Sequence, residues 1–519
     1  MHRCLQVADI VYTVARHIEG DAFGYRNKGC MPDLLRMALA CRSFCEPALA
    51  RLWRHLDDLA VLARTLPAEM LKERKGRLAL VRSPSKAQWV AFERFARYIR
   101  TVHQELDSVD WNSIAARYPG DQLLPSLRCF HSLSDTLSQY LPIFVRPPLV
   151  QLYVEVKSIR TVDIVIECVS SCAKDLEMFV LQVQEVDVMT RYIPESQELA
   201  EVMLSMESLF LCAAGAIPPR TLEYLGSLST LTRFEIEVPR DIPLAPLPFL
   251  ALEVLTIQYG EWLPATIATL LERISAPNLI ELHIYEDGIS ELEGPNDMHI
   301  TSSEICDILT PVEKFAQLRQ FHFFTHMIVW ELPEGGLQTL KPLIALRELE
   351  HIWIKDMDFM LRKSDFEALA DAWPEMRYLR LGDGVPEKLE MPEPMTPLAD
   401  LAVFADHFPR LEMLGLRVFI PREGWCKKIG PPYGQSTSRV RELSLSGLVG
   451  HRRDWRISAA FLSNVFPHAA LCNPESEGTD EDRAEGDTPR RARDMMNKTM
   501  KLLGQLMNQA GVRPPAASA

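Results

Sequence analysis

A six-residue pattern of apolar and polar positions recurs along most of the chain. Each copy has an apolar residue, two other residues, a second apolar residue, one other residue and a third apolar residue. Because apolar and polar residues alternate over its second half, each copy predicts a strand with one buried face. The eleven copies are LVQLYV from Leu149, LEMFVL from Leu176, MESLFL from Met206, LTRFEI from Leu231, LEVLTI from Leu252, LIELHI from Leu279, LRQFHF from Leu318, LEHIWI from Leu349, MRYLRL from Met376, LEMLGL from Leu411 and VRELSL from Val440, and LRCFHS from Leu127 is a weaker twelfth.

The spacing of these copies indicates a repeat architecture. Their starts lie 21 to 39 residues apart, which scatters around the ~20 to 29 residues typical of leucine-rich repeats. Helical stretches such as Ser364 to Trp373 and Leu398 to Phe408 lie between copies, and a proline follows each of them. We therefore expect an α/β solenoid over residues 126–470, a leucine-rich-repeat horseshoe of about 11 to 12 irregular repeats with helices on its outer side.

Both ends of the chain lack this pattern. Residues 1–67 place apolar residues at three- and four-residue steps, which predicts a small helical module, and residues 68–125 predict a helical linker or cap. On pattern alone, the less favoured alternative is a helical cap that covers the first repeat. Residues 471–519 predict an acidic disordered tail with room for one short helix at 495–507.

Composition and charge narrow the classes of function. The formal net charge of −14 disfavours nucleic-acid binding, which needs clustered positive charge. The eleven cysteines include no CxxC pair, which is typical of core residues in a reducing compartment, so we expect an intracellular protein of the cytoplasm, the nucleus or both. The sequence has no run of ~18 consecutive apolar residues, so we expect that no segment spans a membrane.

Motifs for catalysis, cofactors and metals are missing from the sequence. The chain has no glycine-rich phosphate loop, no GxSxG and no HExxH, so we expect a protein that is not an enzyme and that needs no cofactor. His322 and His326 have the spacing closest to that of a metal site. Residues four apart in a strand lie ~13 Å from each other, too far to hold one ion.

The helical module carries a recognisable string of residues. MPDLLRMALACRSFCEPALARLW, from Met31 to Trp53, contains a Leu-Leu pair, an apolar-Cys-Arg step and a closing Leu-Trp. This string resembles the second half of an F-box, although the usual Leu-Pro opening is absent and the insertion from Gly20 to Met31 is longer than usual. The segment from Arg82 to Val102, together with helices that end in Trp-Pro or His-Phe-Pro, resembles the large F-box families of mushroom-forming fungi.

The resemblance implies a substrate-recognition subunit of an SCF-type E3 ubiquitin ligase. In that family the F-box docks onto a Skp-family adaptor, which joins a cullin scaffold, while the repeats hold the protein substrate. The alternative is a ligase-independent leucine-rich-repeat scaffold for protein interactions. The residues that the resemblance and the helical pattern mark for adaptor binding are Leu5, Ile10, Val14, Leu34, Leu35, Ala38, Cys41, Arg42, Leu52 and Trp53.

A protein substrate is expected to bind the outward positions of the strands. Aromatic and arginine side chains contribute much of the binding energy where they cluster at the centre of an interface. The alternative is that these rings pack on each other along the sheet or against the loop that begins at Glu286. The predicted substrate-binding residues are His283, Tyr285, His322, Phe324, Trp353, Lys355, Tyr378 and Arg380.

Overall fold

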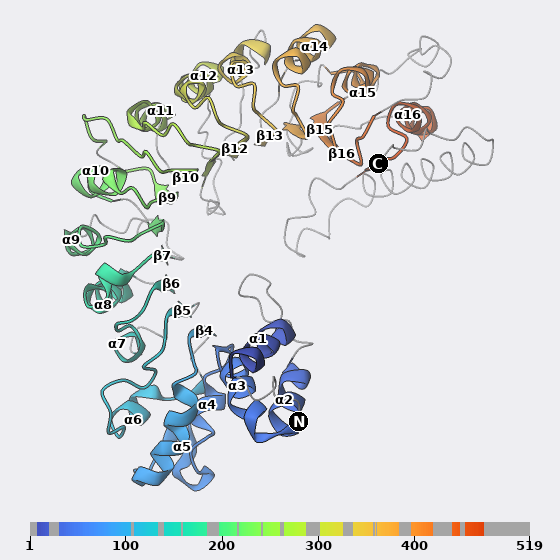
Figure 1. Cartoon of the computed structure of the whole chain (residues 1–519). Coiled ribbons are helices and arrows are strands. Elements are labelled where there is room, and N and C mark those ends of the chain that lie inside the picture. The colour runs from blue at the N-terminus through green and yellow to red at the C-terminus, as the bar shows by residue number, and fades with distance from the viewer. Residues whose placement is uncertain are drawn as a thin grey trace, which may run out of the picture. The chain divides into compact units, whose positions relative to one another are not determined.

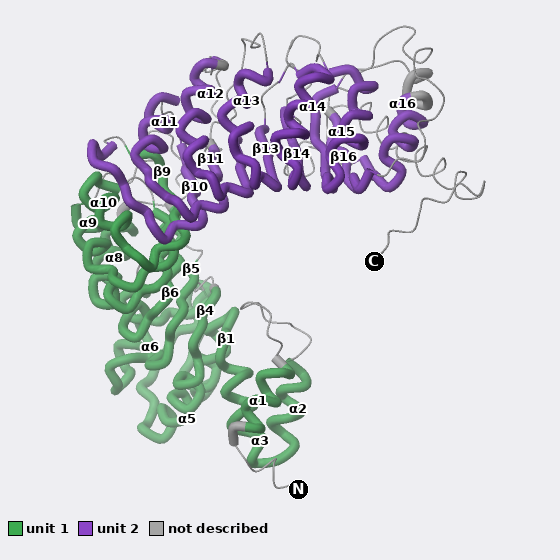
Figure 2. Tube along the Cα trace, turned by 45° about the horizontal axis from the view of Figure 1, so that its top comes forward, with its two compact units in different colours: residues 1–241 green, residues 242–519 purple. Residues whose placement is uncertain are grey.

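The computed structural model divides the chain into two compact units, residues 1–241 and residues 242–519, which are described separately (Figure 2). The structure describes residues 8–19, 31–104, 108–132, 140–156, 159–183, 197–214, 217–239, 242–259, 264–286, 301–324, 336–355, 359, 361–382, 396–418, 438–446 and 452–471. The predicted acidic tail at 471–519 therefore lies almost entirely outside the described residues.

In each unit, parallel strands pair in the order in which the chain makes them. Each strand pairs with the next one along the sequence, which is the arrangement of a solenoid. The ladder of unit 1 consists of β1 (His55–Leu56), β4 (Thr101–Gln104), β5 (Cys129–Ser132), β6 (Gln151–Val156), β7 (Met178–Val183), β8 (Leu211–Ala214) and β9 (Arg233–Glu237). The ladder of unit 2 consists of β10 (Val254–Tyr259), β11 (Glu281–Glu286), β12 (Gln320–Phe324), β13 (His351–Lys355), β14 (Tyr378–Leu381), β15 (Met413–Arg417), β16 (Glu442–Ser446) and β17 (Ala470–Leu471).

Helices connect the strands and cover one face of each ladder (Figure 1). Among the described helices, every one is too short or too polar to cross a bilayer. Unit 1 has α4 (Ala60–Ala63), α5 (Lys86–Ala96), α6 (Trp111–Ala115), α7 (Leu141–Phe144), α8 (Ile159–Ser170), α9 (Gln197–Met203) and α10 (Pro219–Ser227), and a hairpin of β2 (Leu71–Arg74) and β3 (Arg77–Leu80). Unit 2 has α11 (Pro264–Arg273), α12 (Ser302–Leu309), α13 (Gly336–Ile344), α14 (Lys363–Ala372), α15 (Ala402–His407) and α16 (Arg452–Val465).

The core of unit 2 lies between the ladder and its helices, and the recurring hexads build it. The second apolar residue of each hexad pairs with its equivalent on the next strand, so the buried positions form continuous rows. All of these side chains are buried, which confirms the predicted strands and the α/β solenoid. The second-position row is Leu255, Leu282, Phe321, Ile352, Leu379, Leu414 and Leu443.

One hexad was placed wrongly in the sequence. MESLFL from Met206 predicts a strand at 206–211, but β8 begins at Leu211, and Cys212 pairs with Phe179 and Phe234. The hexad of this repeat therefore starts at Leu209 and places Cys212 and Ala214 at its apolar positions. Met206 and Leu209 are three residues apart, like the first two apolar residues of a hexad, and so they look like the start of the repeat. The true hexad is less conspicuous, because the cysteine and alanine that enter the ladder are smaller than Met206 and Leu209.

The ladder begins earlier than residue 126. β1 lies inside the predicted helical module of 1–67, and β4 lies inside the predicted helical linker of 68–125. In β4, Val102 pairs with Phe130 and lies three residues after Ile99, as the second apolar residue of a hexad follows the first. The third position of this hexad, which is apolar in most copies, is Gln104. The third position in β5 is Ser132, which explains why the copy from Leu127 looks weak and the one from Ile99 was missed.

A core leucine of the ladder should contribute strongly to stability. We expect Leu282→Ala to lower the free energy of unfolding by ~2 to 5 kcal/mol, because Leu282 is fully buried and its truncation leaves a cavity. Urea unfolding monitored by circular dichroism measures this loss. Leu244→Ala is the matched control, since the Leu244 side chain is 87% exposed, and a comparable loss in that variant would contradict the assignment of the core.

Candidate functional site

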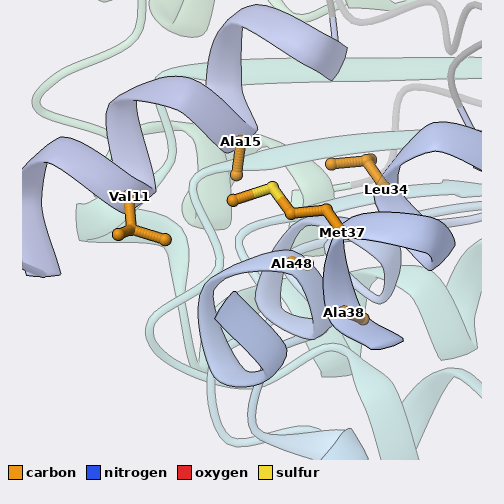
Figure 3. Close-up of a cluster of buried hydrophobic side chains, with 6 residues drawn as sticks. All are labelled: Val11, Ala15, Leu34, Met37, Ala38 and Ala48. Carbon is orange, nitrogen blue, oxygen red and sulfur yellow. The ribbon is translucent and has the colours of Figure 1, made fainter. Parts of the chain in front are cut away.

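The N-terminal module buries a core of its own. Helices α1 (Ala8–Glu19), α2 (Met31–Ala40) and α3 (Arg42–Leu52) pack together, with Ile18, Phe44 and Leu52 partly buried at the margin. Leu34 and Ala38, predicted as adaptor-binding, belong to this core and hold the module together. The central side chains are Val11, Ala15, Leu34, Met37, Ala38 and Ala48 (Figure 3).

Large apolar side chains remain on the surface of the same helices. Ile10 is 39% and Val14 is 41% exposed on α1, and these two residues are one helical turn apart. Leu35 is 51% and Leu39 is 78% exposed on α2, with the same spacing. We call these four residues the apolar surface of the module. Leu39 was missed in the sequence, although its four-residue step from Leu35 placed it on the same face.

The remaining residues predicted for adaptor binding have different surroundings. Cys41 precedes α3 in an extended conformation, and its Sγ lies 3.1 Å from Ser43 Oγ. The hydrogen bond with Ser43 lowers the pKa of the Cys41 thiol from its ordinary value. Arg42 is exposed at the start of α3, and Leu5 lies outside the described residues.

Trp53 attaches the module to the rest of unit 1. Its ring stacks on Phe95 of α5, with 4.4 Å between the centroids and 28° between the planes. Beside this pair, Glu46 of α3 accepts hydrogen bonds from Tyr98 and from Arg97, and it pairs with Arg94 at 3.4 Å. The hydrogen bond from Tyr98 lowers the pKa of the Glu46 carboxyl. Trp53 therefore contacts the linker segment through its ring and is half-buried there.

On unit 2, the outward positions of the strands form three rows that run across the ladder. Seven of the eight predicted substrate-binding residues occupy the second and third rows, and Tyr378 occupies the first. Tyr378 pairs with His351, whereas Arg380 pairs with Trp353. The first row is Val254, Glu281, Gln320, His351, Tyr378, Met413 and Glu442, the second row is Thr256, His283, His322, Trp353, Arg380, Gly415 and Ser444, and the third row includes Gln258, Tyr285, Phe324, Lys355 and Arg417.

The side chains of the second row pack edge to face along the sheet. The centroids of His283 and His322 are 4.5 Å apart, and those of His322 and Trp353 are 6.0 Å apart. Phe324 of the third row contacts Trp353 at 4.6 Å, and the Arg380 guanidinium lies 3.8 Å from the centre of the Trp353 ring. These rings do pack on each other, as the alternative expected, yet all eight predicted residues remain partly exposed.

Charge is distributed unevenly between the rows. Burial lowers the pKa of His322 to about 4, and the nearby His283, His351 and Arg380 contribute in the same direction. Burial also lowers the pKa of His283, against the opposing effect of Glu281, whose Oε2 is 3.7 Å from His283 Nε2. The second row therefore has neutral imidazoles and a cation near neutral pH, while carboxylates stand in or beside the first row.

Three carboxylates in or beside the first row have protein partners. Glu281 accepts a hydrogen bond of 3.1 Å from Gln320 Nε2. Glu412 accepts two hydrogen bonds from Arg377, of 2.6 and 2.9 Å, and Glu350 pairs with Arg319 at 3.6 Å. These interactions join neighbouring strands at one edge of the face.

Unit 1 has a similar row that sequence reasoning missed. His103 of β4 and His131 of β5 have centroids 4.2 Å apart, and His131 stacks on Tyr153 of β6 at 5.5 Å. The Tyr153 hydroxyl donates a hydrogen bond of 2.6 Å to Gln182 Oε1 on β7. Burial lowers the pKa of His131 to about 4. His131 and Tyr153 occupy the same place in their hexads as His283, so that comparison was the signal that could have found them.

Within the described ranges, no group of three or more His, Cys, Asp or Glu side chains has a geometry that holds a metal ion. The ring contacts of the two faces instead suit binding to another molecule through aromatic, imidazole and guanidinium groups.

Comparison with known proteins finds similar chains among solved structures, but no matching family model and no matching curated protein. Among solved structures, a leucine-rich-repeat protein of Leptospira interrogans is similar, with 13% sequence identity and a TM-score of 0.37 over 80% of this chain and 99% of that one.

The buried imidazole of His322 should make stability depend on pH. In the unfolded chain its pKa is about 6.5, and in the folded chain it is about 4, so the unfolded state binds more protons between these values. We expect the free energy of unfolding to fall as the pH falls through this window. His322→Gln should reduce the slope of the free energy of unfolding against pH. The reduction should be smaller than the limit of ~1.4 kcal/mol per pH unit for one proton, because the side chain is partly exposed.

Urea unfolding at several pH values between these limits measures the slope. His407→Gln is the control, because His407 is exposed on α15. Equal slopes in the wild-type protein and in His322→Gln would contradict the burial of a neutral imidazole.

Proposed function

We propose that this chain is a protein-binding repeat protein and acts as the substrate-recognition subunit of an SCF-type ubiquitin ligase. In this proposal the helical module docks onto a Skp-family adaptor, and the adaptor connects it to a cullin scaffold. The strand face of unit 2 holds a protein substrate. The chain itself performs no chemistry, works inside the cell in the cytoplasm or nucleus, and binds neither nucleic acid nor a membrane.

The observation that carries the docking step is the apolar surface of the module. Ile10, Val14, Leu35 and Leu39 are exposed although the three helices already enclose a core. Large apolar side chains that stay exposed on a module with its own core are candidates for an interaction site. The string from Met31 to Trp53 that resembles an F-box contains two of these residues, which favours a Skp-family adaptor as the partner.

The second row of unit 2 supports substrate binding. Trp353 and Arg380 lie at its middle and contact each other directly. Tryptophan, tyrosine and arginine are the residues that most often dominate the energy of protein interfaces. Neighbouring side chains on the sheet already hold Trp353 and Arg380 in place. Binding of a partner therefore costs little side-chain entropy at these two residues.

A ligase-independent repeat scaffold is the second candidate. It is favoured by the environment of Trp53, the closing residue of the F-box-like string, which stacks on Phe95. Leu34 and Ala38 are buried as well, so fewer residues of the string are available to an adaptor than the resemblance implies. The two candidates share the substrate face and differ only in whether an adaptor binds.

Charge on the apolar surface should abolish adaptor binding. We expect Leu35→Asp with Leu39→Asp to remove co-purification of a Skp-family adaptor with the full chain, because two carboxylates would be desolvated at the interface. The matched control is Leu244→Asp with Leu250→Asp, which makes the same change at two exposed leucines of unit 2.

The outcome separates the two candidates. Adaptor capture by the wild-type chain and by the control, with loss in the test variant, supports the ligase subunit. Failure of the wild-type chain to capture an adaptor would favour the scaffold.

Truncation of aromatic side chains on the strand face of unit 2 should weaken the binding of substrate proteins and leave adaptor binding unchanged. We expect Trp353→Ala with Tyr378→Ala to reduce co-purification of substrate proteins by tenfold or more, since hot-spot truncations cost about 2 kcal/mol or more. Quantitative mass spectrometry of tagged chains measures this, and adaptor capture should remain unchanged. Unaltered substrate capture with an intact unfolding transition would place the binding surface elsewhere.

A further inference from the structure

A β-hairpin in unit 1 stands outside the parallel ladder. Its two strands, β2 and β3, pair antiparallel. On its other side, β3 forms a bridge between Leu78 and Val109, and the Leu80 N–H donates a hydrogen bond of 2.9 Å to Ser113 Oγ of α6. The rest of unit 1 therefore holds β3 in place, and β2 is the edge strand of this small sheet.

The register shows which backbone groups of β2 face the free edge. In an antiparallel pair, residues that bond across to the partner strand alternate with residues whose N–H and C=O point away from it. Met70, just before β2, accepts a hydrogen bond of 2.8 Å from a backbone N–H just after β3, so the next residues that bond to β3 are Lys72 and Arg74. The N–H and C=O of Leu71 and Glu73 therefore point to the free edge.

The side chains of this edge strand are mostly basic. Lys72 and Arg74 are two residues apart, so they lie on the same face of the strand, and Lys75 follows in the turn. All three are exposed, and none forms an ion pair with any residue that the structure describes. Glu73, on the opposite face, is exposed as well. The edge thus combines outward backbone groups with free cations on one face.

The turn of the hairpin adds the third cation at a position that rarely carries one. Lys75 has a φ of 53° and Gly76 has a φ of 74°, which a two-residue type I′ turn requires. Asparagine, aspartate or glycine is usual at the first of these positions, because most other side chains are strained there. A lysine keeps a positive charge at the tip at some cost in backbone strain.

The charge around the hairpin is positive, although the chain as a whole carries a formal charge of −14. Among the neighbouring groups, Arg77 donates to the Tyr140 hydroxyl at 3.4 Å, and Asp110 caps the first turn of α6. An acidic protein segment suits this modest excess of cations, whereas nucleic acid needs denser positive charge. The charged residues from 69 to 82 are Lys72, Arg74, Lys75, Arg77 and Arg82, against Glu69 and Glu73.

We propose that β2 binds an extended acidic segment of a partner protein, which adds to the hairpin as a third, antiparallel strand. The outward N–H and C=O groups of Leu71 and Glu73 supply the backbone hydrogen bonds. Lys72 and Arg74 select carboxylates at alternate positions of the added strand, since directly opposed residues share a face.

The same pairing limits which acidic segments fit. Residues between the selected carboxylates lie opposite Leu71 and Glu73, so the negative charge of Glu73 disfavours a continuous acidic run. The proposed surface shares no residue with the apolar surface of the module or with the strand face of unit 2. Charged edge strands also prevent pairing between copies of a protein, and that role alone predicts that no acidic peptide binds.

The test measures peptide binding to the full chain by fluorescence anisotropy. The probes are fluorescein-labelled peptides of about ten residues that alternate Thr with Glu, alternate Thr with Gln, or carry the same Thr and Glu residues in two blocks. We expect the alternating Thr-Glu peptide to bind most tightly, because it alone places carboxylates opposite the two cations and threonine opposite Glu73. Rising salt concentration should weaken this binding.

N-methylated forms of the alternating Thr-Glu peptide test strand pairing itself. In the added strand, the threonines opposite Leu71 and Glu73 point their N–H groups at β2, and the glutamates point theirs away. Methylation of the threonine nitrogens should therefore abolish binding, whereas methylation of the glutamate nitrogens should retain it. Glu73→Pro removes an outward N–H without removing a bond to β3 and should weaken binding, while Glu73→Gln, which keeps that N–H, should not.

Matched variants separate this edge from general attraction. Lys72→Gln with Arg74→Gln should weaken the alternating Thr-Glu peptide by about two- to thirtyfold, as expected for two exposed ion pairs. Arg64→Gln with Lys174→Gln is the control, since both residues are exposed in unit 1. Equal binding of the Glu and Gln peptides, equal binding of the two methylated peptides, or equal loss in both double variants would overturn the proposal. Tighter binding of a labelled single-stranded RNA of equal charge would overturn it as well.

Discussion

The fixed register of the parallel strands is the constraint on which the rest of this structure depends. Within each unit, an apolar residue of one strand pairs with the equivalent residue of the next, as Leu282 does with Leu255 and Phe321. A slip of one residue would turn every core side chain to the outward face. Because burial of the apolar rows opposes that slip, the register of the outward rows is fixed by the core beneath them.

The outward rows inherit this order, and their chemistry follows from it. Equivalent positions on neighbouring parallel strands are about one strand spacing apart, so a histidine recurring at the same hexad position must meet its counterpart. His283 and His322 do so in unit 2, and His103 and His131 do so in unit 1. Crowding of imidazoles on a half-buried sheet lowers their pKa, because desolvation and basic neighbours both oppose protonation.

Much of the ladder could be predicted from the sequence, because a period of two with large apolar residues is a local signal. The prediction failed where the buried position is small or polar. Cys212 and Ala214 displaced one hexad, and Gln104 hid β4. Pairing between strands is a non-local property. The hexads therefore predict which residues point outward, whereas the pairing of Tyr378 with His351 depends on counting from the buried residue of each strand.

The helical module shows a different limit of prediction. Helical spacing identifies which residues share a stripe, but it does not say which stripe meets the other two helices. Leu34 and Leu35 are adjacent in the sequence and look alike in the F-box-like string, yet one lies in the core and the other is exposed. The packing of α1 and α3 against α2 makes that distinction, since Met37 and Ala38 share the buried side with Leu34. The same packing leaves Leu35 and Leu39 facing away, so the residues most able to bind a partner are those that the module's own core does not need.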